Sequence, residues 1–135
     1  MIRAVLDTNV LVSALILRGP TNQLVPLWQE EKFTLVLSKE IISECLRVFA
    51  YPKFKLSSEA IRTLVEMEIL PFSEPVQIRH IPEVIHKDPS DNIFLACAVE
   101  GKCQYLVSGD HHLLDLKSHR GIPIISTAAF LLKLA

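Results

Sequence analysis

The sequence lacks several features that would each assign it to a particular class of protein. It has no apolar run of the roughly 18 to 20 residues that a membrane-spanning helix needs, and its longest such stretch, VLVSALIL, is far shorter. Its 14 basic and 15 acidic residues give a net charge of −1, so the chain as a whole has no positive field that would attract nucleic acid. No internal repeat, low-complexity tract or linker is present.

Cysteine is also scarce. An odd number of cysteines at irregular spacing argues against a disulfide framework and fits a reducing compartment. With no secretory signal ahead of the first apolar stretch, we expect a cytoplasmic protein. A zinc site can be drawn from Cys97, Cys103, His111 and His112, but the chain has no closely spaced cysteine pair to favour it. The three cysteines are Cys45, Cys97 and Cys103.

The pattern of apolar segments predicts an α/β fold. At 135 residues, 50% hydrophobic and 21% charged, the chain fits a single domain over residues 1–135. Short, continuously apolar runs alternate with helical segments, which is typical of a mostly parallel sheet covered on both faces. Five strands are predicted, at residues 4–6, 33–37, 76–78, 105–107 and 122–125.

Several helix ends are also readable. Ser38 is expected to cap a helix through residue 49, Ser57 one through about residue 69, and Ser126 or Thr127 a last helix. Asp88, followed by proline and with Asp91 three residues on, predicts a capped helix start. Gly101 is expected to end that helix.

Acidic residues follow the predicted strands. In open parallel sheets, ligands bind outside the carboxyl ends of the strands. Asp7 ends the first strand among aliphatic neighbours, and Asp110 follows the fourth strand after Ser108 and a glycine. Asp91 begins the helix that leads into the fourth strand. We therefore expect these acids to gather at one edge of the sheet.

The helix after the second strand supplies two more acids, Glu40 and Glu44. At 100° per residue, Glu44 lies at the margin of the apolar stripe, whereas Glu40 lies roughly 40° further round and faces water more easily. Glu44 is therefore the better candidate for the site, with Glu40 as an auxiliary.

A cluster of four carboxylates requires positive charge. Like charges about 4 Å apart cost on the order of 4 kcal/mol per pair at an effective dielectric of 20, and divalent cations remove that cost. An all-oxygen set favours Mg²⁺ or Mn²⁺ over zinc. Such a cluster suits hydrolysis of a phosphodiester.

Each acid also has an ordinary structural interpretation. Asp88 and Asp91 can serve as charges at a helix N-terminus, and Asp110 can serve as a turn residue. Glu40 and Glu44 can be solvated helix acids. His111 and His112 can contact a scissile phosphate or lie in an exposed loop without a role.

Four motifs together resemble a known family. They cover residue 2 to about residue 132, and residues 51–87 are the least specific part. The motifs are LDTNVLVSAL, SKEIISECLRVF, DPSDNIFLACAVEGKCQYLVSGDHHLLDL and GIPIISTAAFL. In this order and separation they resemble the PIN-domain ribonucleases, in the branch described as toxins of toxin–antitoxin systems.

The resemblance implies a PIN-like three-layer sandwich, a five-stranded mostly parallel sheet flanked by helices, and Mg²⁺- or Mn²⁺-dependent cleavage of RNA. It further implies an antitoxin protein as partner and a homodimer as the assembly. The acids that match the family's metal-binding positions are Asp7, Glu44, Asp91 and Asp110. The polar residues that match supporting positions are Thr8, Asn9, Asn92 and Ser108.

Two other functions stay open at this point. A receiver-like signalling module would accept a phosphoryl group on a strand-end aspartate, but it usually needs a paired acid at the first strand and a lysine after the last. A non-catalytic PIN-like binding protein would keep the fold and lack a working metal site.

Overall fold

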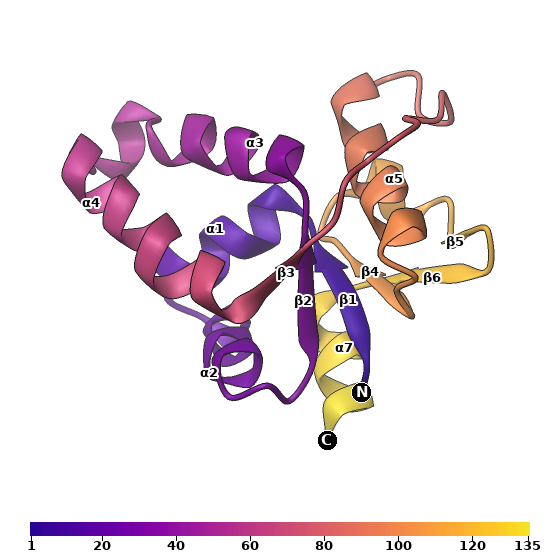
Figure 1. Cartoon of the computed structure of the whole chain (residues 1–135), viewed down its shortest axis with the longest axis horizontal. Helices are drawn as coiled ribbons and strands as arrows, with labels where there is room; N and C mark the ends of the chain where they lie inside the picture. The colour runs from indigo at the N-terminus through magenta and orange to yellow at the C-terminus, as the bar shows by residue number, and fades with distance from the viewer.

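The centre of the molecule is a six-stranded sheet, which the computed structural model describes within residues 1–135 (Figure 1). The strand order is β3-β2-β1-β4-β6-β5. All neighbours pair in parallel except β5 and β6, which form an antiparallel hairpin. The strands are β1 (Arg3–Leu6), β2 (Thr34–Leu37), β3 (Ser73–Pro75), β4 (Tyr105–Val107), β5 (Ser118–His119) and β6 (Ile122–Ile125).

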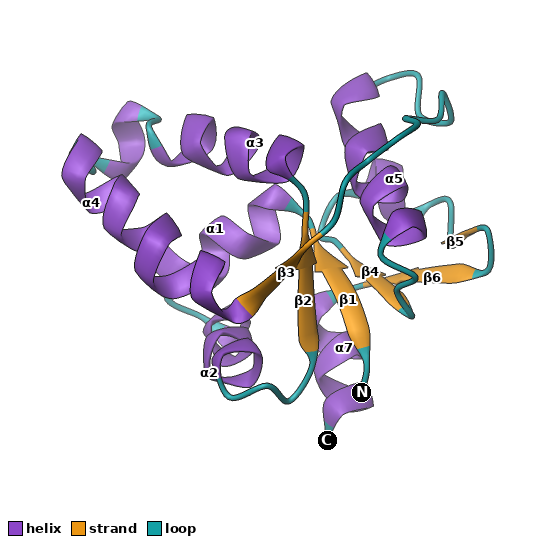
Figure 2. Ribbon diagram, in the orientation of Figure 1, coloured by secondary structure: helices purple, strands orange, loops and turns teal.

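Helices flank the sheet on both sides, which gives the predicted α/β class. Figure 2 shows α5 on one side of the strands and α1, α2 and α4 on the other. No helix is long and apolar enough to cross a membrane. The helices are α1 (Thr8–Ile16), α2 (Leu24–Gln29), α3 (Lys39–Phe49), α4 (Ser58–Thr63), α5 (Asn92–Glu100), α6 (His111–Leu114) and α7 (Thr127–Leu134). Shorter helical turns are η1 (Pro20–Gln23), η2 (Pro52–Phe54), η3 (Leu64–Ile69, a π-helix), η4 (Leu70–Phe72) and η5 (Pro89–Asp91).

The core explains why the strands read as continuous apolar runs. A cluster of 31 buried residues includes the inner residues of β1 and β2, which are covered on both faces. Phe33 and Phe130 meet edge to face with their ring centroids 5.0 Å apart, so α7 is packed onto the segment that enters β2. α5 is buried on most of its surface, as its apolar sequence predicts.

The serine caps confirm three predicted helix starts. Ser38, Ser57 and Ser126 each accept a hydrogen bond from the backbone N–H three residues later. The prediction for Asp88 was wrong, because its side chain caps no backbone group. Its carboxylate accepts a hydrogen bond from the Ser90 hydroxyl, and a short 3₁₀ turn precedes α5. Gly101 ends α5 as predicted.

Two strand predictions need correction. The third strand lies at Ser73–Pro75 rather than at residues 76–78. Its partner β2 ends at Leu37, where Ser38 starts α3, so residues beyond Val76 have no strand to pair with. The added strand β5 is only two residues long and was not predicted. It pairs with β6 through a two-residue turn, Arg120 and Gly121, in which both residues have positive φ.

The strand order also bears on the receiver-like alternative. Receiver-type sheets follow the flavodoxin-like order 2-1-3-4-5. Here the first strand lies between the second and the fourth, and the third strand lies outside the second. The sheet therefore does not support a receiver-like module.

Gly101 provides a test of the packing between α5 and β2. A Cβ at this position would lie 2.6 Å from Cγ1 of Val36, a fully buried residue of β2. We predict that Gly101→Ala lowers the free energy of unfolding by about 1 to 3 kcal/mol, because overpacking forces the strand or the helix end to move. Urea denaturation measures this value. Gly109→Ala is the control, since nothing lies within 4 Å of a Cβ there. Equal stability of the two variants would contradict the close packing.

Candidate active site

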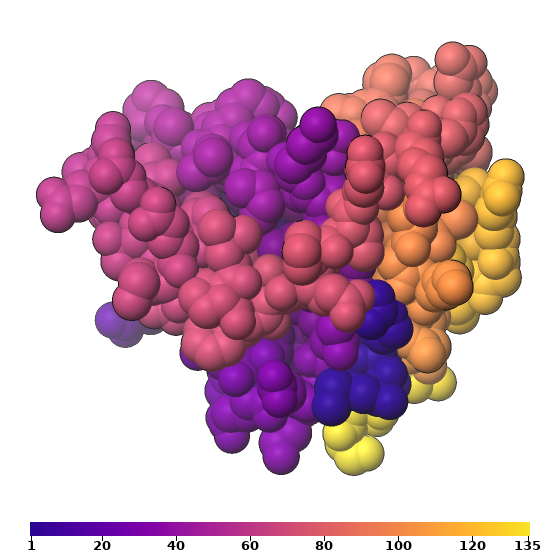
Figure 3. All heavy atoms as spheres, viewed as in Figure 1, coloured from indigo at the N-terminus to yellow at the C-terminus, as the bar shows by residue number.

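The carboxyl ends of β1 and β4 bring acids from four segments to one edge of the sheet. Asp7 directly follows β1, Asp110 follows β4, Asp91 ends the turn before α5, and Glu44 lies on α3. Figure 3 shows the α3 segment and the residues leading into α5 standing at the same end of the molecule. Three of these acids are close enough to interact electrostatically, because the charges of Asp110 and Glu44 both raise the pKa of Asp7.

Asp7 is held by two hydrogen bonds in a buried position. Its Oδ1 accepts from the backbone N–H of Val10 at 2.9 Å, so the residue caps α1. Its Oδ2 accepts from the hydroxyl of Ser108, which follows the neighbouring strand β4. The side chain therefore joins the end of one strand to the end of the next and has a fixed orientation.

The cap alone does not explain why this residue is an acid. Burial raises the pKa of Asp7 to about 6, and the hydrogen bonds from Ser108 and Val10 only partly oppose that rise. A neutral cap such as asparagine or serine would bind the same N–H without the cost of burying a charge. The carboxylate at this position therefore makes the fold less stable than a neutral cap would.

Ser108 connects Asp7 to Asp110. Its hydroxyl donates to Asp7 and accepts from the backbone N–H of Asp110 at 2.9 Å. The side chain of Asp110 in turn accepts from the backbone N–H of His112 at 2.8 Å and caps α6. Asp110 is thus both a turn residue and a member of the acid cluster. A single buried hydroxyl therefore links the carboxylate of Asp7 to the backbone of Asp110.

Asp91 has an unpaired oxygen in this cluster. The residue is only 7% exposed, and its buried Oδ2 has no hydrogen-bond partner. Burial raises its pKa to about 7, and the neighbouring charge of Asp110 adds to the rise. A buried carboxylate oxygen without a donor is unfavourable unless a ligand satisfies it. This oxygen marks a place where a cation fits.

Asn92 holds Asp91 in position. Its side-chain oxygen accepts from the backbone N–H groups of Val84 and Ile85, and its amide nitrogen donates to the carbonyls of Ile85 and Pro89. All of the hydrogen-bonding capacity of this buried amide is used. Asn92 therefore ties the incoming loop to the start of α5, next to Asp91.

Of the two glutamates of α3, only Glu40 differs from expectation. Glu44 is half-buried, with a side chain that is 15% exposed, and its nearest cation is the exposed Arg47 at 3.8 Å. Glu40 does not face water as predicted, because its Oε1 is buried without a partner. The charge of Glu40 raises the pKa of Cys97 in α5. The charges that raise the pKa of Asp7 are those of Asp110 and Glu44. Glu40 is shielded because α5 covers this side of α3, which the periodicity of α3 alone cannot reveal.

No hydrogen bond joins the side chain of Thr8 or Asn9 to Asp7, so their supporting role stays a prediction. Thr8 is buried beside Cys45, and Asn9 is exposed. The groups that fix Asp7 are the backbone of Val10 and the hydroxyl of Ser108.

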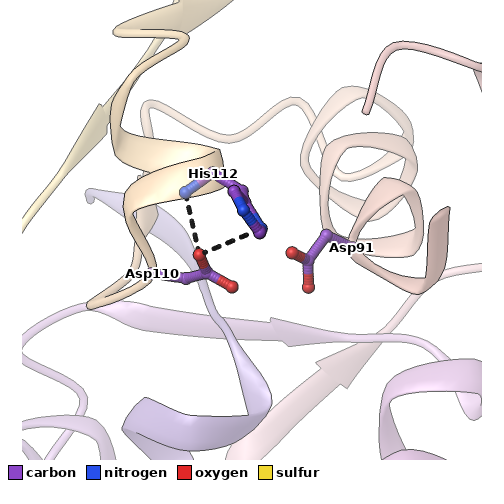
Figure 4. A group of neighbouring side chains, drawn as sticks. All are labelled: Asp91, Asp110 and His112. Carbon is purple, nitrogen blue, oxygen red and sulfur yellow. Dashed lines mark hydrogen bonds and ion pairs between the residues drawn. The ribbon is translucent and has the colours of Figure 1, made fainter. Parts of the chain in front are cut away.

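The sequence named His112 as a candidate only together with His111, and the structure separates the two. Ligand atoms of Asp91, Asp110 and His112 all lie within 4.8 Å of one another. Figure 4 shows the two carboxylates and the imidazole facing a common space. His111, next to it in sequence, is exposed. No pattern in the sequence separates the two histidines, because the direction of each depends on how α6 starts at Asp110.

The donor set fits a hard divalent cation. Carboxylates predominate, and the Asp91 oxygen lacks any other partner. The zinc alternative built on Cys97, Cys103 and both histidines is not supported, since neither cysteine belongs to the group. Burial also raises the pKa of both thiols to about 12.

The raised pKa of Asp7 makes a prediction about metal-free protein. An acid whose pKa is higher in the folded state destabilises the fold once the pH exceeds its ordinary value near 3.8, and the full loss is reached above about pH 6. We predict that Asp7→Asn, which keeps an acceptor for Val10, raises the free energy of unfolding at pH 8 by about 1 to 3 kcal/mol. The gain should vanish near pH 3.5. Urea denaturation in EDTA at both pH values measures it, and a gain that is independent of pH would contradict the assignment.

Comparison with known proteins places the chain in a family. A family model described as PIN domain matches residues 3–112, a span that includes Asp7, Glu44, Asp91 and Asp110. No curated protein gives a significant match. The chain therefore belongs to the PIN-domain family, whose members are typically nucleases that use divalent metal ions.

Proposed function

We propose that this protein is an endoribonuclease that depends on Mg²⁺ or Mn²⁺ and hydrolyses RNA phosphodiester bonds. Asp7, Glu44, Asp91 and Asp110 would hold the cation. The observation that carries the proposal is the buried, unpartnered oxygen of Asp91, which lies near carboxylates whose charges raise the pKa values of Asp91 and Asp7. Such an arrangement is unfavourable in the absence of a cation.

The residues of the chain have separate parts in this proposal. A bound divalent cation would lower the pKa of a water molecule and neutralise charge that develops on the phosphate. Asp91 and Asp7 would lose their protons when the cation binds, because both have pKa values raised toward neutrality. Ser108 would hold the carboxylate of Asp7 and the backbone of Asp110 in fixed relative positions through its two hydrogen bonds.

RNA is the substrate that the resemblance to PIN-domain ribonucleases favours. The net charge of −1 does not oppose it, since carboxylates that hold cations count as negative in the sequence but present a neutral or positive surface once loaded. The helices α1 and α5 begin directly after Asp7 and Asp91, so the positive end of each helix dipole lies at this edge and favours an anionic ligand there.

The same resemblance extends the proposal to a biological role. The motifs match the branch of PIN-domain proteins described as toxins, so we propose that this chain is the toxin of a toxin–antitoxin pair. An antitoxin protein would then be its partner, and a homodimer its assembly.

Removal of single acids should abolish cleavage. We predict that the purified protein cleaves RNA with Mg²⁺ or Mn²⁺ and that EDTA stops the reaction. Asp7→Asn and Asp91→Asn should each lower kcat/KM by about 100-fold or more, because a lost ligand removes cation binding at the reacting phosphate. A fluorogenic RNA substrate measures the rate. Asp115→Asn, at an exposed position just after α6, is the matched control and should cleave normally.

The outcomes separate the nuclease from a binding protein. Cleavage that persists in both site variants would come from a contaminant or another site, and it would overturn the proposal. Absence of both cleavage and Mn²⁺ binding by calorimetry in the wild-type protein would favour a non-catalytic PIN-like binding protein.

The toxin role makes a separate prediction in cells. Induced expression of the wild-type chain in a bacterial host should arrest growth and degrade cellular RNA, because no antitoxin restrains the nuclease. The Asp7→Asn variant, expressed to the same level, should allow normal growth. Growth curves and total RNA gels measure both effects. Normal growth with an enzyme that is active in vitro would contradict the toxin role and leave the nuclease activity standing.

A further inference from the structure

His112 has a nitrogen without a partner at the acid cluster. Its side chain is 30% exposed overall, but Nδ1 is buried and accepts or donates no hydrogen bond. Its Nδ1 lies 3.7 Å from Oδ1 of Asp110, which is within ion-pair range but too far for a hydrogen bond (Figure 4). The buried nitrogen therefore faces this carboxylate without a hydrogen bond to it.

The neighbours of His112 do not account for this placement. The ring of His111 lies against it with centroids 4.4 Å apart at an angle of 57°, a contact between ring faces and edges that leaves the buried nitrogen unpaired. The backbone N–H of His112 is fixed by the side chain of Asp110 at 2.8 Å. The helix start therefore sets the position of the imidazole relative to Asp110, and the ring is directed at the site where Asp91 also lacks a partner.

We propose that His112 is a ligand of the divalent cation, so that the site has a mixed nitrogen and oxygen donor set and prefers Mn²⁺ to Mg²⁺. This inference rests on the proposed function. Its geometric basis is the group of ligand atoms from Asp91, Asp110 and His112, all within 4.8 Å of one another.

The preference follows from ligand chemistry. Mg²⁺ demands oxygen ligands and gives up its waters reluctantly, so an imidazole contributes little to its binding. Mn²⁺ shares the affinity of Mg²⁺ for carboxylates but is a transition metal, which binds imidazole nitrogen more readily. With only one nitrogen among carboxylates, the set is less suited to the softer cations that favour thiolate or several imidazoles.

Pulsed electron paramagnetic resonance of Mn²⁺ bound to the full chain tests the ligand directly. We expect nitrogen hyperfine coupling in the wild-type protein and its loss in His112→Gln. His111→Gln, the exposed neighbour on the same helix, is the matched control and should keep the coupling. Wild-type protein labelled with ¹⁵N only at histidine should show the hyperfine coupling of ¹⁵N in place of that of ¹⁴N. This result assigns the coupling to histidine even where the His112→Gln variant does not fold.

Binding titrations test the preference. We expect the wild-type protein to bind Mn²⁺ at least about tenfold more tightly than Mg²⁺, and His112→Gln to lose most of that ratio by weakening Mn²⁺ binding about tenfold. His112→Asp, which replaces the imidazole with an oxygen ligand, should bind both cations. Its ratio of Mn²⁺ affinity to Mg²⁺ affinity should be smaller than that of the wild type.

The results distinguish this inference from the proposed function. Bound Mn²⁺ without nitrogen coupling, or coupling that persists in His112→Gln, would overturn the role of His112 while leaving the metal-dependent nuclease intact. Failure of the wild-type protein to bind Mn²⁺ at all would overturn both.

Discussion

The contact between Ser108 and Asp7 is the interaction on which the arrangement of this edge depends. The two residues directly follow neighbouring central strands, so the parallel pairing of β1 with β4 places them opposite each other. The same hydroxyl accepts from the backbone of Asp110, and that residue starts α6 and thereby positions His112. One buried serine thus links the register of the sheet to three side chains at the candidate site.

The residues of the candidate site lower the stability of the fold. Asp7 and Asp91 are buried acids with raised pKa values, and Asp91 and Glu40 each leave a buried oxygen without a partner. The hydrophobic core, with its large aromatic residues and a fully buried Trp28, supplies the stability that tolerates this cost. Strained electrostatics at one edge of an otherwise well-packed sheet is typical of a binding or catalytic centre.

Much of this architecture could be predicted from local sequence patterns. Continuous apolar runs predicted β1, β2, β4 and β6, and Ser38, Ser57 and Ser126 predicted helix starts, because both signals act over a few residues. The strand-end rule also predicted that Asp91 and Asp110 lie together. What failed depends on distant segments: the end of β2 decides where β3 pairs, and α5 covers Glu40. The sequence could not separate His112 from His111, because adjacent histidines become distinct only when α6 is placed.

Two of the acids have a second duty as helix caps, and this has an evolutionary consequence. Asp7 and Asp110 both accept backbone N–H groups at the first turns of α1 and α6. Asparagine accepts such hydrogen bonds as well as aspartate, and one base change converts the aspartate codon into that of asparagine. The helix caps at these two positions therefore do not require the negative charge, and only selection on function would preserve it in descendants of this gene.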